Sequence, residues 1–232
     1  MAQWALVTGA TAGIGESFTR LLASKGYNVA LVARDEARLH ERAAGLREKY
    51  GVQTFVLPAD LSTNEGCRSV EDYISTYEIE VLINNAGFGI NKAFSTSQMD
   101  AEQQMFDVLV RTPMRLMHTI IPGMKERKSG IIINNSSVAS FIAGGTYSAA
   151  KSYLTVLSES MNTELASSGV KVSALCPGFT RTEFHERGRM KMGGLPKFMW
   201  LNSDYFVAKS WKDAQANKPV SIPGWQYKLL VG

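Results

Sequence analysis

The stretch Trp4-Ala-Leu-Val-Thr-Gly-Ala-Thr-Ala-Gly-Ile-Gly15 joins a short apolar run to three glycines. The apolar run predicts a buried strand, and the amphipathic segment that begins at Glu16 predicts a helix after it. Glycine leaves the backbone open to a pyrophosphate, and a helix N-terminus offers that group free N–H donors and a partial positive charge. Glycines in this position therefore favour a dinucleotide-binding turn over an empty tight turn. The turn residues expected to contact the cofactor are Gly9, Thr11, Gly13, Ile14 and Gly15.

Apolar runs and amphipathic stretches continue to alternate along the chain. Continuous apolar runs are typical of parallel strands that are covered on both faces. The pattern predicts an α/β fold, with a doubly wound parallel sheet in a single three-layer (α/β/α) Rossmann-type domain over residues 1–232. The expected strands are Trp4 to Thr8, Asn28 to Ala33, Gln53 to Leu57, Val81 to Asn84, Ile131 to Asn134, Val170 to Leu175 and Pro219 to Ile222. The expected helices are Glu16 to Ser24, Glu36 to Lys49, Gln103 to Arg127, Ser148 to Ser167 and Asp204 to Asn217.

The last third of the chain departs from this rhythm. Residues Phe184 to Trp200 are rich in Met, Gly and aromatic side chains without a clear period, and a helical stretch follows them. We interpret 184–217 as a substrate-covering flap with a helical segment. An irregular connection is the alternative for the first part.

Composition narrows the class of protein. The 232 residues are 45% apolar and 20% charged, which fits a globular domain and no fibrous or disordered class. Neither the two cysteines nor the three histidines have the spacing of a metal site, so no metal is expected. The net charge of +4 without a basic run gives no indication of nucleic-acid binding. No apolar run is long enough to span a membrane and no signal peptide is evident, so we expect a cytoplasmic protein without a membrane partner.

The end of the second expected strand bears on which dinucleotide binds. An acid at this point usually accepts from the ribose hydroxyls of NAD, whereas the 2′-phosphate of NADP requires a cation. Arg34 follows the strand, and its guanidinium can donate twice to a phosphate. Asp35 is counter-evidence, although it also fits as the N-cap of the next helix. The sequence favours NADP(H) over NAD.

Tyr147 and Lys151 are four residues apart at the start of an expected helix. Such a pair shares one helix face, and an ammonium beside a tyrosine lowers the pKa of the phenol toward a working pH. Tyr147 can then exchange a proton with a carbonyl or alcohol oxygen. Ser137, at the end of the fifth strand, is the expected hydroxyl that holds this oxygen, with Ser136 as the alternative. Asn84, at the end of the fourth strand, is expected to fix backbone groups between neighbouring strands.

With these motifs in place, the chain resembles the short-chain dehydrogenase/reductase family over nearly its full length. The resemblance implies that Tyr147, Lys151 and Ser137 are catalytic, and that Lys151 also holds the nicotinamide ribose. It places an adenine pocket at Asp60-Leu61 and a nicotinamide contact in the loop that begins at Pro177. The further cofactor-binding residues that it implies are Asn85, Ala86, Gly87, Gly178, Thr180 and Thr182, besides Arg34, Tyr147 and Lys151.

Two features depart from the family pattern. Leu109 stands where the family commonly has an asparagine that holds a water leading to the lysine. Leucine cannot hydrogen-bond a water, so the usual proton relay cannot be carried over, and another donor or a backbone kink must serve. The spacing from Ser137 to Tyr147 is also shorter than is usual in the family, which reshapes the substrate pocket.

These features together predict an NADP(H)-dependent oxidoreductase that interconverts a carbonyl and a secondary alcohol by hydride transfer. The alternative is an NADP-binding protein with weak or no catalysis, suggested by Leu109. An apolar substrate is expected because Phe88, Phe141, Phe184 and the Met-rich stretch can surround it. The resemblance implies a homodimer or homotetramer, formed through the two long helices at Gln103 to Arg127 and Ser148 to Ser167. Apolar residues in excess of one buried face, which support this interface, are Met114, Leu116, Met117, Tyr153, Leu154 and Val156.

Overall fold

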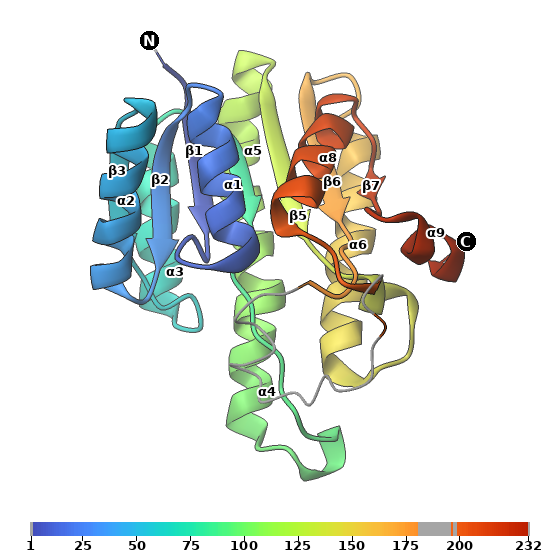
Figure 1. The fold of residues 1–232 in the computed structure, drawn as a ribbon. Coiled ribbons are helices and arrows are strands. Elements are labelled where there is room, and N and C mark those ends of the chain that lie inside the picture. The colour runs from blue at the N-terminus through green and yellow to red at the C-terminus, as the bar shows by residue number, and fades with distance from the viewer. Residues whose placement is uncertain (1, 181–195, 197–198, 232) are drawn as a thin grey trace.

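A computed structural model describes residues 2–180, 196 and 199–231. Its described strands form one sheet in the order β3-β2-β1-β4-β5-β6-β7, and every neighbouring pair is parallel (Figure 1). This is the doubly wound sheet that the sequence predicted. The strands are β1 (Trp4–Thr8), β2 (Asn28–Ala33), β3 (Thr54–Pro58), β4 (Ile79–Asn84), β5 (Gly130–Asn135), β6 (Val170–Leu175) and β7 (Val220–Ser221).

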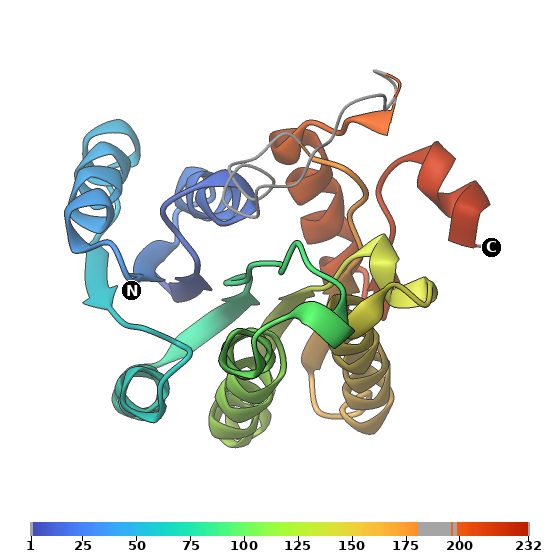
Figure 2. The ribbon, with the colours of Figure 1, turned by 90° about the horizontal axis from the view of Figure 1, so that it is seen from below.

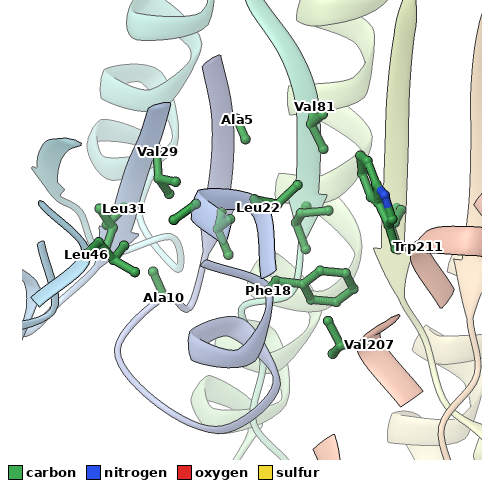
Figure 3. Close-up of a cluster of buried hydrophobic side chains, with 14 of the residues drawn as sticks. Ala5, Ala10, Phe18, Leu22, Val29, Leu31, Leu46, Val81, Val207 and Trp211 are labelled. Carbon is green, nitrogen blue, oxygen red and sulfur yellow. The ribbon is translucent and has the colours of Figure 1, made fainter. Parts of the chain in front are cut away.

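Helices cover both faces of the sheet (Figure 2). One face carries α1 (Gly13–Ser24), α2 (Glu36–Tyr50) and α8 (Ser203–Gln215), and the other carries α3 (Asn64–Thr76), α5 (Thr112–Arg127) and α6 (Gly145–Glu164). Successive side chains of a strand point to opposite faces. Val7 therefore packs with Phe18 of α1 in the core shown in Figure 3, while its neighbour Leu6 packs in the core on the other face.

Most expected elements lie within a few residues of their observed bounds, but α3 and the C-terminal helix α9 (Trp225–Val231) were not predicted. Helix α3 has a clear sequence signal in retrospect. The Thr63 hydroxyl accepts a hydrogen bond from the Gly66 N–H as an N-cap, and the buried positions recur at helical spacing. Its polar composition concealed this pattern.

The long helix expected at Gln103 to Arg127 is divided in three. Helix α4 (Met99–Phe106) and α5 are joined by a π-helical turn, η2 (Asp107–Arg111). The Thr112 N–H donates to the carbonyl of Asp107, five residues back. Pro113 explains why a regular helix fails here, because it lacks the N–H that would bond to the carbonyl of Leu109. Leu109 lies at the middle of this π-helical turn.

The helical part of the predicted flap is a core helix. In α8 (Ser203–Gln215), Phe206, Val207 and Trp211 are buried against α1 and the sheet, as Figure 3 shows for the last two. The apolar face of this helix packs in the core, and the predicted substrate-covering role of 184–217 stays a prediction. Residues 184–195, 197 and 198 of the predicted flap lie outside the described residues.

Within the described ranges, none of the helices combines the length and apolar character needed to cross a membrane. The same residues bring no three His, Cys, Asp or Glu side chains together in a metal-binding group.

Candidate active site

Side-chain hydrogen bonds lock the carboxyl ends of β1, β4 and β5 together. The Asn85 side-chain amide donates to the Thr8 carbonyl (2.8 Å), and the Thr8 hydroxyl oxygen accepts from the backbone N–H groups of Asn85 and Ala86. The Asn135 side-chain amide donates to Asn85 Oδ1 (3.0 Å). The sequence assigned the linking of backbone groups to Asn84. The Asn84 side chain, at the end of β4, does cross to β5, where it donates to Asn134 Oδ1 in the core (2.9 Å), but its partner is a side chain. The bond to a backbone carbonyl of the neighbouring strand comes from Asn85 instead.

The glycine turn is shaped by close packing as well as by access for a ligand. A Cβ on Gly15 would lie 2.1 Å from the Gly9 carbonyl oxygen, so helix α1 can approach the turn only with glycine there. Gly9 and Gly13 have positive φ angles, +67° and +56°, that favour glycine. Helix α1 begins after Ala12, which offers no side-chain cap. Its first N–H groups thus suit a phosphate group.

The residues after β2 place a patch of arginines near this turn, in which Arg38 pairs with Asp35, and Arg42 pairs with Glu16 and Glu41. Arg34 is exposed, and Asp35 caps α2 by accepting a hydrogen bond from the Arg38 N–H (3.0 Å), as the sequence suggested. Arg42, which the sequence analysis missed, donates to the Thr11 carbonyl at 3.4 Å. Its spacing of four residues from Arg38 on the same helix face was the available signal.

Asp60 lies beside this patch. Burial raises the pKa of Asp60, but the Ser62 amide and hydroxyl and the nearby Arg34 outweigh burial and hold it below its ordinary value. Leu61 is buried in the core, and its carbonyl accepts from the Thr112 hydroxyl (2.8 Å), which ties this loop to the start of α5.

Ser137, Tyr147 and Lys151 meet at the end of β5, as the sequence predicted. A side-chain hydrogen bond joins Ser137 and Tyr147. Lys151 is buried, its ammonium donates to the Asn135 carbonyl at 2.6 Å, and its Nζ lies 5.6 Å from the centre of the Tyr147 ring. This arrangement places a proton donor, a hydroxyl and a cation within one group.

The pKa values of the pair differ from the expectation. Burial raises the pKa of Tyr147 to about 12, and the Ser137 hydrogen bond opposes this only in part. Burial lowers the pKa of Lys151 to about 8. The expected lowering of the tyrosine pKa by its ammonium neighbour was therefore wrong for this structure, because desolvation is the larger effect. Tyr147 is a neutral hydroxyl near neutral pH, and Lys151 remains mostly charged.

The two candidate serines have different surroundings. The hydroxyl of Ser136 is buried, donates to the Lys151 carbonyl (2.8 Å) and contacts the Thr155 hydroxyl (2.7 Å). Ser137 is only half-buried and bonds to Tyr147, besides accepting from the Ala139 N–H at the start of η3 (Val138–Phe141). Of the two, Ser137 is the hydroxyl available to a substrate oxygen.

An apolar wall flanks Tyr147. Leu109 is 1% exposed and packs with Met105, Phe88 and Tyr147. A Cβ on Gly87 would lie 2.8 Å from the Leu109 side chain, so the loop after β4 also rests on this residue. A cavity of about 320 Å³ opens beside the wall. Its lining residues are Ile90, Lys92, Ala93, Phe94, Met105, Gly144, Gly145, Thr146 and Tyr147.

One polar contact at this cavity was not predicted from the sequence. The buried carboxylate of Glu102, in α4, accepts a hydrogen bond from the Thr146 hydroxyl at 2.6 Å. Thr146 directly precedes Tyr147, so this bond fixes the first turn of α6 against α4. Of the aromatic residues expected around the substrate, Phe88 lies in the wall, Phe141 is exposed in η3, and Phe184 is outside the described residues.

The loop after β6 reaches the same edge of the sheet. The Pro177 carbonyl accepts from the Val138 N–H (3.1 Å), directly after Ser137. Thr180 is buried and its hydroxyl donates to the Gly178 carbonyl (3.1 Å). Thr182 lies outside the described residues.

The buried Lys151 yields a stability prediction. Its folded-state pKa of about 8 lies below the ordinary 10.5, so the charged form is disfavoured on folding. This cost is fully present below pH 8 and vanishes as the pH rises through 10.5. We therefore expect the stability of Lys151→Met relative to the native chain to fall by about 3 kcal/mol between about pH 7 and pH 10.5.

Denaturant unfolding at several pH values measures this difference. Lys212→Met, on the exposed side of α8, is the matched control for loss of a lysine charge. A Lys151→Met effect that stays constant across the range would contradict the burial argument.

The sequence is similar to known proteins of one family. The model of the short chain dehydrogenase family matches residues 3–192. The chain is 35% identical over 74% of its length to a very-long-chain 3-oxoacyl-CoA reductase of Laccaria bicolor, and 31% identical over 78% of its length to the human inactive hydroxysteroid dehydrogenase-like protein 1. It spans only 53% and 56% of these two proteins.

Solved structures of short-chain dehydrogenases have the same fold as this chain. A short-chain dehydrogenase from Sphingobium yanoikuyae in complex with NADPH superposes with a TM-score of 0.92 at 30% identity, covering 98% of this chain and 91% of that one. The motifs, the sheet order and these likenesses lead to one conclusion: the chain belongs to the short-chain dehydrogenase/reductase family.

Proposed function

We propose that the protein is an NADPH-dependent reductase that interconverts a carbonyl and a secondary alcohol. The observation that carries the proposal is the meeting of Ser137, Tyr147 and Lys151 at the sheet edge to which the glycine turn also belongs. Such a group supplies a proton donor, an orienting hydroxyl and a cation beside a phosphate-binding turn.

In this mechanism the nicotinamide, when bound, supplies the hydride that reaches the carbonyl carbon. Ser137 holds the carbonyl oxygen by a hydrogen bond, and Tyr147 gives its phenolic proton to that oxygen as the alcohol forms. The Lys151 ammonium, 5.6 Å from the ring centre, stabilises the negative charge that develops on Tyr147. The neutral state of Tyr147 near neutral pH suits reduction, because the hydroxyl carries the proton that the step needs.

The proposed preference for NADPH rests on Arg34 and Asp35. Arg34 is exposed where a 2′-phosphate would lie in such a fold. Arg42, near Thr11, is already paired with Glu16 and Glu41, so Arg34 is the cation that carries the proposal. Asp35 is occupied in capping α2 and lies 3.6 Å from the Arg38 guanidinium. An acid held in this way does not compete for the ribose hydroxyls as it would in an NAD-binding protein.

We propose an apolar ketone or acyl thioester as the substrate, because the cavity beside Tyr147 is walled by Ile90, Phe94 and Met105. The name of the Laccaria bicolor relative, a 3-oxoacyl-CoA reductase, points to the same class.

A homodimer is proposed through the exposed faces of α5 and α6. Met114, Tyr153 and Val156 are exposed there, and the Tyr153 hydroxyl contacts the Met114 sulfur across the two helices. The other three residues expected in this interface are buried in the monomer and cannot contribute, namely Leu116, Met117 and Leu154.

A second candidate function is NADP binding with weak or no catalysis. Leu109 favours it, since this side chain fills the space beside Tyr147 with an apolar wall, and the human relative's name contains the word inactive. The π-helical turn at Leu109 favours the reductase, since π-helical turns inside α-helices are frequent at functional sites.

Replacement of Tyr147 by Phe tests the proton donor. We expect Tyr147→Phe to lower turnover at least about 10²-fold, the scale of general acid catalysis, while NADPH binding stays within about twofold. Steady-state rates over a ketone panel and fluorescence titration measure the two quantities. Undiminished turnover would remove Tyr147 from the mechanism.

Replacement of Arg34 by Ala tests the cofactor preference. Loss of a charge-assisted phosphate contact should weaken NADPH binding by about tenfold or more and leave NADH binding nearly unchanged. Parallel fluorescence titrations with the two cofactors show the ratio. An equal loss for both cofactors would argue against a 2′-phosphate contact at Arg34.

Replacement of Leu109 by Asn separates the two candidate functions. If the native turn already supports the relay, Leu109→Asn leaves turnover unchanged or lowers it, because it puts an amide into an apolar cluster. A large gain in turnover over a native chain of low activity would support the weakly catalytic reading.

A further inference from the structure

Tyr227, in the short C-terminal helix α9, lies directly against the loop after β6. The side chain is 1% exposed, although α9 has an exposed outer side. A Cβ on Gly178 would lie 1.9 Å from the Tyr227 ring. Gly178 is therefore glycine because the ring occupies the space that any other side chain would need.

The Tyr227 hydroxyl makes two hydrogen bonds, one on each side of the segment that follows this loop. It accepts from the Phe179 N–H at 2.9 Å and donates to the Met199 carbonyl. The Leu201 N–H in turn donates to the Phe179 carbonyl at 2.8 Å. The point where the chain leaves the β6 loop and the point where it returns are thus fastened together, with Tyr227 at the junction.

The other side of the same loop is fastened to the active site. The Pro177 carbonyl accepts from the Val138 N–H, which follows Ser137 in the chain. Pro177 to Thr180 is therefore held between Ser137 and Tyr227. A phenylalanine would fill the space beside Gly178 equally well, so packing alone does not explain a hydroxyl that is both donor and acceptor.

We propose that Tyr227 is a positioning residue for the nicotinamide half of the cofactor. It acts by fixing the position of the loop from Pro177 to Thr180. This inference rests on the proposed function, because it requires that the loop faces bound NADPH. It assigns to the C-terminal helix a part in the reaction centre, although α9 is remote in sequence from Ser137, Tyr147 and Lys151. Tyr227 should not affect the adenosine half of the cofactor, because Arg34 and Asp60 follow β2 and β3, at the other end of the sheet from β6.

The test compares two ligands on Tyr227→Phe. We expect NADPH to bind about tenfold more weakly, because a loop freed from these two hydrogen bonds must be ordered when the nicotinamide half binds. In contrast, 2′,5′-ADP, which carries only the adenosine half, should bind within about twofold of the native chain. Gly178→Ala, which meets the ring from the loop side, should show the same selective loss. Tyr205→Phe is the matched control, since Tyr205 lies 65% exposed on α8.

The possible results distinguish failure of this inference from failure of the proposed function. Native-like NADPH binding by both Tyr227→Phe and Gly178→Ala overturns the inference, and so does an equal loss for both ligands, which would indicate general loosening of the fold. If the native chain binds neither NADPH nor 2′,5′-ADP, the proposed function itself fails, and the positioning role fails with it.

Discussion

The hydrogen bonds of the Asn85 side chain are the constraint on which the site depends. They bind the carboxyl ends of β1, β4 and β5 into one unit, so that the glycine turn after β1 and Ser137 after β5 cannot move independently. The same side chain limits its neighbours, because a Cβ on Gly9 or Gly15 would lie within 2.8 Å or 2.5 Å of its amide nitrogen. The cofactor turn is thus fitted to this amide as well as to a phosphate.

Burial sets the pKa values of Tyr147 and Lys151, and the burial of the lysine ammonium lowers the stability of the fold. Removing the Lys151 ammonium from water lowers its pKa to about 8, and the same surroundings raise the pKa of Tyr147 to about 12. The fold therefore maintains a charged lysine and a neutral tyrosine side by side near neutral pH. The proposed reduction needs this combination, and the apolar residues around Leu109 are part of the surroundings that bury Tyr147.

Local patterns in the sequence predicted the parallel sheet and most of the residues at the candidate site. The glycine spacing, the four-residue interval from Tyr147 to Lys151 and the continuous apolar runs each depend on neighbouring residues, and the sheet and the catalytic group followed from them. Contacts between distant segments were not predictable in this way. Nothing local shows that Asn85, rather than Asn84, bonds to the backbone of β1. Nor does anything local show that Trp211 belongs to the core, or that the Tyr227 ring rests on Gly178. Pro113 was a local signal that the regular helix is interrupted near Leu109. The packing of Leu109 beside Tyr147 is a contact between distant segments, so the sequence did not show why this interruption matters.

The central claim is that this edge of the sheet transfers hydride from NADPH to a carbonyl carbon. Its most direct measurement uses NADPH deuterated at either of the two C4 positions of the nicotinamide, with a panel of apolar ketones and 3-oxoacyl thioesters and mass analysis of the alcohols. We predict that deuterium from one of the two labelled forms appears on the carbinol carbon. Tight binding of NADPH without transfer of either label to any member of the panel would contradict it.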